Sequence, residues 1–147
     1  MAERWAFCFV PSEAMTKKKK IKNIWLSKSL EKDFRAAHDY LTLLFKRSDV
    51  DTLIRRLHGA RVVDYQAKDL LRASQTHLLE EDNPHVADQL KKIKKGKKMS
   101  PVLLVKGDGK TGITLTIADG HHRICASWYC DEDAPIACCL AELPAKR

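Results

Sequence analysis

TIADGHHRICA, residues 116–126, is the stretch of sequence that best predicts the fold. Apolar residues alternate with small or polar ones over residues 113–118, a period of two that is typical of a strand with one buried face. Asp119 and Gly120 then predict a tight turn, because glycine adopts backbone conformations that a side chain forbids. From His121 onward the apolar spacing changes to that of a helix. The sequence therefore predicts a strand, a turn and a helix in immediate succession.

The junction of this turn and helix gathers residues suited to binding an anion. The first turn of a helix presents unpaired backbone N–H groups and a partial positive charge. We therefore expect Gly120 and the N–H groups after it to hold a phosphate, with Arg123 as a charge-assisted clamp. His121 or His122 would donate to a phosphate oxygen or move a proton near neutral pH. Asp119 would orient one of these side chains or hold Mg²⁺.

Two other interpretations of the junction involve no phosphate. In one, the Asp-Gly pair only forms the turn and the histidines only cap the helix. In the other, His121, His122, Cys125 and Cys130 bind zinc. Adjacent residues of a helix point about 100° apart, which disfavours chelation by both histidines. We therefore expect no metal ion bound by this set.

Two helices are expected before residue 60. The first would be capped by Ser27 or Ser29 and end near Arg47, and the second would run from about residue 48 to Gly59. Together they predict a helical hairpin that follows an N-terminal arm. The apolar stripe of the first helix consists of Leu30, Phe34, Ala37, Leu41 and Leu44.

The rest of the chain predicts a mixed α/β (α+β) fold with a small sheet. Asn83 is expected to cap a helix whose first residue is Pro84, and Gly96 to end it. The domain boundaries that follow are 1–59 for the arm and hairpin and 60–147 for the core. The expected core elements are a strand at 62–65, helices at 67–73 and 84–95, strands at 101–106 and 113–118, a helix at 121–129 and a strand at 134–140.

The composition is that of an ordinary soluble globular chain. Of the 147 residues, 44% are hydrophobic and 31% are charged, and the apolar runs are too short to span a bilayer. The N-terminal residues do not have the order of a secretory signal, and an odd number of cysteines, five, fits reduced thiols. We therefore expect a cytoplasmic protein that has no membrane partner.

The positive net charge suggests a polyanionic partner. The chain carries a formal charge of +8, and residues 1–60 supply most of it with 13 Lys and Arg against 7 Asp and Glu. DNA is therefore a candidate partner, and a solvated lysine surface is the simpler alternative. The candidate nucleic-acid contacts lie near the end of the helix expected after Asn83: Lys91, Lys92, Lys94, Lys95, Lys97 and Lys98.

The chain from Arg61 to Leu143 is similar to the ParB/sulfiredoxin superfamily. The resemblance implies a small mixed sheet with helices, to which the N-terminal hairpin is an addition. The segments that carry it are Val62-Val63-Asp64-Tyr65, Ile93-Lys94-Lys95-Gly96, Ser100–Val105 and Ile117–Arg123.

Departures from the superfamily's motifs narrow what the resemblance implies. Sulfiredoxins carry a catalytic cysteine where His121 stands, so sulfinic-acid reduction by that route is not expected. Partition ParB proteins carry a Gly-Glu-Arg-Arg-type box for CTP, which matches here only at Gly120, Arg123 and Ala126.

The Asp-Gly-His-His-Arg string is most similar to the branch that includes free-serine kinases. In that branch the turn binds the phosphates of a nucleotide. The resemblance then implies ATP or another nucleotide with Mg²⁺. It also implies a general base at Glu80, to which Glu81 is nearly equivalent in position.

We therefore expect a domain that binds a nucleotide or a phosphorylated small molecule. If the protein is an enzyme, an ATP/ADP-dependent phosphotransferase or phosphohydrolase, such as a small-molecule kinase or nucleotidase, is the favoured class. One alternative is a DNA-associated ParB-like module or nuclease, and another is a non-enzymatic interaction domain. The sequence leaves the nucleotide, the substrate and the oligomeric state open.

Overall fold

The computed structural model describes residues 24–145, and the arm expected over residues 1–23 lies outside them. Strands and helices are mixed along this part of the chain, as predicted. The elements in chain order are α3 (Glu31–Leu41), α4 (Arg47–Gly59), β1 (Val63–Gln66), α5 (Ala67–Ser74), α6 (Pro84–Lys94), β2 (Val102–Val105), β3 (Thr116–Asp119), α7 (His121–Cys130) and β4 (Pro135–Ala141).

The four strands form one mixed sheet in the order β1-β4-β2-β3. β4 runs parallel to β2 and antiparallel to β1, and β2 pairs with β3 in antiparallel register. The mixed α/β fold class and the order of elements from β1 to β4 are therefore confirmed.

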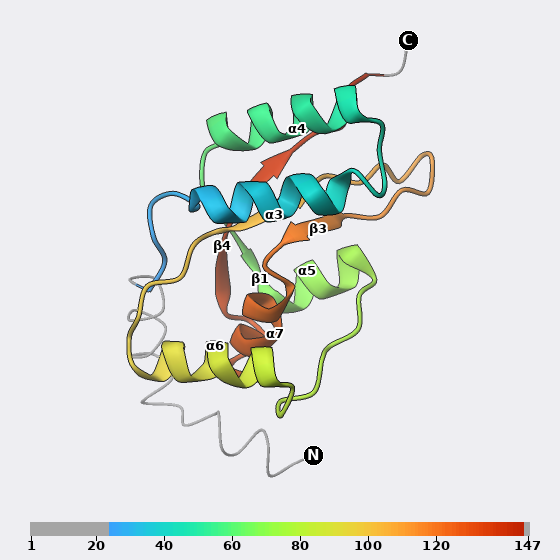
Figure 1. The fold of residues 1–147 in the computed structure, drawn as a ribbon. Helices are drawn as coiled ribbons and strands as arrows, with labels where there is room; N and C mark the ends of the chain where they lie inside the picture. Colours follow the sequence, from blue (N-terminus) through green and yellow to red (C-terminus); the bar gives the residue numbers. More distant parts are fainter. Residues whose placement is uncertain (1–23, 146–147) are drawn as a thin grey trace.

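Helices cover both faces of the sheet (Figure 1). α3 and α4 lie on one face, and α5, α6 and α7 lie on the other. All four residues of β2 are buried, because Val102 and Leu104 pack toward α5–α7 while Leu103 and Val105 pack toward α3 and α4. This explains why the sequence of β2 is an uninterrupted apolar run, which is typical of a strand buried on both faces.

The first helix is shorter than the sequence predicts. α3 ends at Leu41, where the chain turns and Thr42 donates hydrogen bonds through its N–H to His38 O and through its hydroxyl to Asp39 O. Leu44, expected on the buried stripe, lies beyond this turn and is 51% exposed.

The expected serine cap of this helix is also absent. The N-cap residue is Leu30, and its N–H donates to the Asp33 carboxylate at 3.2 Å. Ser29 donates its hydroxyl to Pro101 O instead, which joins this segment to the start of β2.

Two other helix predictions are confirmed. α4 ends at Gly59 and buries Val50, Leu53 and Leu57. At the start of α6 the Asn83 side chain accepts hydrogen bonds from the N–H groups of His85 and Val86, and Pro84 follows as the first helical residue.

β3 begins at Thr116, three residues later than the alternating pattern predicts. Residues 113–115 close a hairpin loop instead, in which Asp108 and Ile113 are bridged. Leu115 donates its N–H to Ala73 O near the end of α5, so this segment has left the sheet. The alternation of apolar and polar residues continues through residues 113–115, so it could not show where β3 begins.

Gly120 sets the angle between β3 and α7. Its φ of +112° lies in the region that side chains rarely adopt. A Cβ on this residue would stand 2.8 Å from Val102 Cβ and 2.9 Å from Arg123 Nη2. The turn therefore needs glycine both for its backbone conformation and for its close approach to β2.

We predict that Gly120→Ala lowers the free energy of unfolding by at least about 2 kcal/mol, because backbone strain and overpacking each cost about 1–3 kcal/mol. Chemical denaturation measures the change. Gly109→Ala is the matched control, since a Cβ there meets nothing within 4 Å. Equal stability of the two variants would contradict this explanation of the turn.

Candidate functional site

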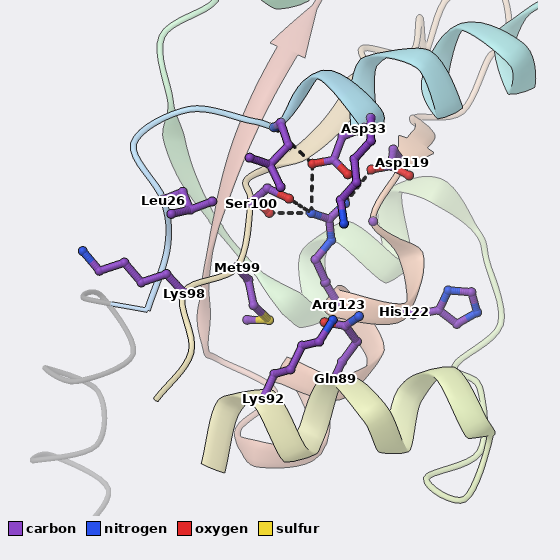
Figure 2. Close-up of a pocket in the computed structure, with 13 residues that line it drawn as sticks. Leu26, Asp33, Gln89, Lys92, Lys98, Met99, Ser100, Asp119, His122 and Arg123 are labelled. Carbon is purple, nitrogen blue, oxygen red and sulfur yellow. Dashed lines mark hydrogen bonds and ion pairs between the residues drawn. The ribbon is translucent and has the colours of Figure 1, made fainter. Parts of the chain in front are cut away.

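Arg123 is the centre of a buried ion cluster at the predicted junction (Figure 2). Its Nη2 donates to Asp119 Oδ2 at 2.6 Å, and its Nη1 donates to Ser100 O at 2.7 Å and also to the Ser100 hydroxyl. Asp33 Oδ2 lies 3.7 Å from Nη1. We name Arg123, Asp119, Asp33 and Ser100 the Arg123 cluster. It joins α7, the end of β3, the first turn of α3 and the residue before Pro101.

The Arg123 cluster contains one cation and two carboxylates. The Arg123 side chain is 9% exposed, so its charge is largely removed from solvent. Burial raises the pKa of Asp119, and the charge of Asp33 raises it further, while Arg123 opposes both effects. An anionic ligand would therefore meet the Arg123 guanidinium together with two carboxylates, not as an unpaired charge.

A pocket of about 270 Å³ lies against this cluster. Lys32, Lys92 and Lys98 line it from three different parts of the chain, and Figure 2 shows the Lys98 side chain extending away from the ion cluster. With Arg123, the lining holds four cations and two carboxylates, an excess of two positive charges. The remaining lining residues are Leu26, Leu30, Gln89, Met99, Ser100, Gly120 and His122.

The N-terminus of α7 also faces this pocket. Gly120, its N-cap residue, and His122 in its first turn both line the cavity. No side chain caps this helix end. The positive end of the helix dipole thus adds to the excess of lysine charge.

His122 lies at the pocket, where its ring centroid is 4.9 Å from that of His85. In Figure 2 it projects from α7 on the side away from the ion cluster. Burial lowers its pKa, and the neighbouring charges of His85, His121 and Arg123 lower it further. The ring is therefore largely neutral at pH 7, which is the form that can accept a proton.

His121 points elsewhere. Its Nε2 lies 3.7 Å from Cys125 Sγ, one turn along α7, and it does not line the pocket. Burial lowers the pKa of His121 and raises the pKa of the Cys125 thiol. Both shifts favour the neutral forms of the His121 ring and the Cys125 thiol, as expected for side chains that pack together on one helix.

The other predicted site residues lie in two places. Lys92 and Lys98 line the pocket, whereas Glu80 is exposed in the loop before α6 and does not. Lys92 also lies 3.6 Å from Asp88, in an exposed ion pair. The predicted lysines that are exposed outside the pocket lining are Lys91, Lys94, Lys95 and Lys97.

Sequence reasoning missed Lys32, Asp33 and Ser100. Lys32 and Asp33 belong to α3, which lies far from the junction in sequence, and no local motif connects them to it. The only sequence signal at Asp33 was an acidic residue in the first turn of a helix. That signal predicts a favourable interaction with the helix N-terminus and not a contact with Arg123.

Within residues 24–145, no group of three or more His, Cys, Asp or Glu side chains is placed to hold a metal ion. In the same range no helix is long and apolar enough to cross a membrane. Asp119, the residue expected to hold Mg²⁺, instead accepts a hydrogen bond from Arg123. Any Mg²⁺ at this site would therefore depend mainly on the ligand's own oxygens.

Comparison of the chain with known protein families, with curated proteins and with solved structures gives no match. The resemblance to the ParB/sulfiredoxin superfamily therefore stays a prediction from sequence motifs. The class of protein that the structure defines is a mixed α/β domain with a positively charged pocket at a strand–helix junction.

We predict that Arg123→Met lowers the free energy of unfolding by about 3 kcal/mol, because it leaves the buried Asp33 and the half-buried Asp119 without their cation. The loss should shrink on acidification, because burial raises the pKa of Asp119 and its carboxylate then loses its charge, and Arg123→Met/Asp119→Asn should recover part of it. Urea denaturation gives the values. Arg72→Met is the control, since its ion pair with Asp69 is exposed and should cost less than about 1 kcal/mol.

We predict that stability falls as the pH is lowered from about 7 to about 5. Folding lowers the pKa of His121 and of His122, so below about pH 6.5 the unfolded chain binds protons that the folded chain does not. Denaturation curves across this range measure the slope. His121→Gln/His122→Gln should make the slope shallower, and an unchanged slope would contradict the assignment.

Proposed function

We propose that the pocket beside the Arg123 cluster binds the phosphate group of a nucleotide or of a phosphorylated small molecule. The observation that carries the proposal is that Lys32, Lys92 and Lys98 line the same cavity as the uncapped N-terminus of α7. Ammonium groups and helix N-termini are both favourable partners for phosphate oxygens.

The size of the cavity limits how much of a ligand it encloses. At about 270 Å³ it is below the roughly 300–1,000 Å³ that is typical of sites enclosing a drug-sized molecule. It suits a phosphate with a small attached group, or the phosphate end of a nucleotide whose base lies outside. Mg²⁺ would accompany a nucleotide and reduce repulsion between its phosphates and the two carboxylates of the cluster.

The proposal is first of all that the pocket binds a phosphate group. An enzymatic role extends it and needs a catalytic residue at the pocket. The candidate proton acceptor of a phosphotransferase or phosphohydrolase is His122, which is neutral and lines the pocket. Its ring would have to turn toward the ligand from the side on which Figure 2 shows it. Glu80, which the family resemblance suggests as the base, does not line the pocket. Support for an enzyme therefore rests on His122 alone.

We predict that Lys92→Ala/Lys98→Ala weakens phosphate binding at least about tenfold, since each lost charge–phosphate contact is worth about 1 kcal/mol or more. Isothermal titration with inorganic phosphate, AMP, ADP, ATP and CTP, each with and without Mg²⁺, measures the affinity of the wild type and of the variant.

Lys91→Ala/Lys97→Ala is the matched control, because it removes the same charge from exposed residues outside the pocket lining. It should bind as the wild type does. Absence of binding of every one of these ligands to the wild type, or equal losses in the two variants, would refute the pocket as the phosphate site.

DNA binding is the second candidate, favoured by the run of lysines at the end of α6, of which Lys91, Lys94, Lys95, Lys97 and Lys98 are exposed. Binding to a phosphate backbone depends on the number of cations and weakens steeply with salt. Here the two double variants should lose affinity equally in a mobility-shift titration over salt concentration. The same two double variants therefore distinguish the two functions: unequal losses indicate a ligand bound in the pocket, and equal losses indicate DNA.

A further inference from the structure

In the part of the chain that the structure describes, β1 is an open edge of the sheet. Its only strand partner within residues 24–145 is β4, and residues 61–66 are all exposed. Three of them are large and apolar: Val62 and Val63 are each 38% exposed, and Tyr65 is 42% exposed. The opposite edge, β3, is packed against α3. Proteins usually protect such an edge with charged residues, proline, a bulge or a short strand. β1 is short, with four residues, but Asp64 is its only charged residue and it contains no proline.

Hydrogen bonds to β4 fix which backbone groups of β1 point outward. Ala67, the residue after the strand, donates its N–H to Ala134 O at 3.0 Å, and Pro135, opposite Gln66, has no N–H to give. Antiparallel pairs alternate between hydrogen-bonded and non-hydrogen-bonded positions. The odd-numbered residues of β1 therefore bond to β4, and the even-numbered ones direct N–H and C=O to the open edge.

We propose that this edge pairs with the same edge of a second copy of the chain, which joins two four-stranded sheets into one continuous sheet. Two identical antiparallel strands in one sheet are related by a two-fold axis perpendicular to it. Each residue must then face one on the same side of the sheet, so the axis passes midway between one residue of β1 and the same residue of the second copy. Val63 and Asp64 are the two central residues of the strand that could face their own copies across this axis.

The side chains favour the register with Val63 on the axis. Val63 then faces its own copy, which is a favourable β-branched pair, and Arg61 faces the second copy's Tyr65, a cation beside an aromatic ring. The outward backbone groups of Val62 and Asp64 meet those of Asp64 and Val62 in the second copy. With Asp64 on the axis, two carboxylates would face each other, which is destabilising.

The first test is a disulfide cross-link in the full chain. Val63→Cys should give a disulfide-linked dimer on a non-reducing gel after mild oxidation, because non-hydrogen-bonded partners have Cα atoms about 4.5 Å apart. Val62→Cys is the matched control. Its sulfur faces Asp64 of the second copy, so it should not cross-link, and the wild type corrects for the native cysteines. Cross-linking of Val62→Cys but not Val63→Cys would overturn the register.

The second test is the mass in solution at about 150 mM salt, where repulsion between the positively charged chains is screened. Sedimentation equilibrium should show a dimer for the wild type and a monomer for Val63→Lys, which places two ammonium groups on the axis. Leu43→Lys alters an apolar side chain that is 80% exposed elsewhere, and should stay dimeric.

A monomeric wild type at every concentration would overturn the proposal and leave the edge to residues 1–23 or to a different protein. A dimer that survives Val63→Lys would equally exclude this edge as the interface. Thermal denaturation of Val63→Lys establishes that a loss of dimer is not a loss of fold.

Discussion

The structure depends on one buried guanidinium held by two carboxylates and a serine. Arg123 links the β3–α7 junction, where it bonds to Asp119, to two segments distant in sequence: α3 through Asp33 and the approach to β2 through Ser100. A buried ion pair contributes little net stability compared with apolar packing, but an unpaired member is costly. Alternative arrangements of these segments are thereby penalised, and the lining of the pocket is fixed at the same time.

This arrangement changes the meaning of the Asp-Gly-His-His-Arg string. The sequence predicts that its residues meet at a ligand, and four of the five, Asp119, Gly120, His122 and Arg123, do line one pocket. Within the pocket, however, Asp119 and Arg123 bond to each other and the His122 ring lies against His85, while His121 contacts Cys125 outside the pocket. The positive charge that the pocket offers to a ligand comes mainly from lysines of α3, α6 and the segment after α6. The turn positions the cavity, and other elements supply its charge.

The elements that sequence reasoning predicted well are those with strong local signals. Gly120, the Asn83-Pro84 cap and the apolar run of β2 each determine local structure by conformation or burial, and all were predicted. The errors arose where tertiary contacts decided: α3 ended early because the chain turns at Thr42, and β3 started late because Leu115 bonds to α5. The contribution of Lys32 and Asp33 to the pocket could not be predicted, because it depends on how α3 packs on the sheet.

The position of β4 has a consequence for how the chain folds as it is synthesised. β4 is the last strand of the described residues, yet it lies between β1 and β2 and hydrogen-bonds to both. A nascent chain can form α3 and α4 early and the β2–β3 hairpin once residue 119 has emerged, but β1 has no strand to join until residues 135–141 have left the ribosome. Such long-range pairing slows folding and prolongs exposure of apolar surface. Completion of the sheet is therefore delayed until nearly all of the described chain has been translated.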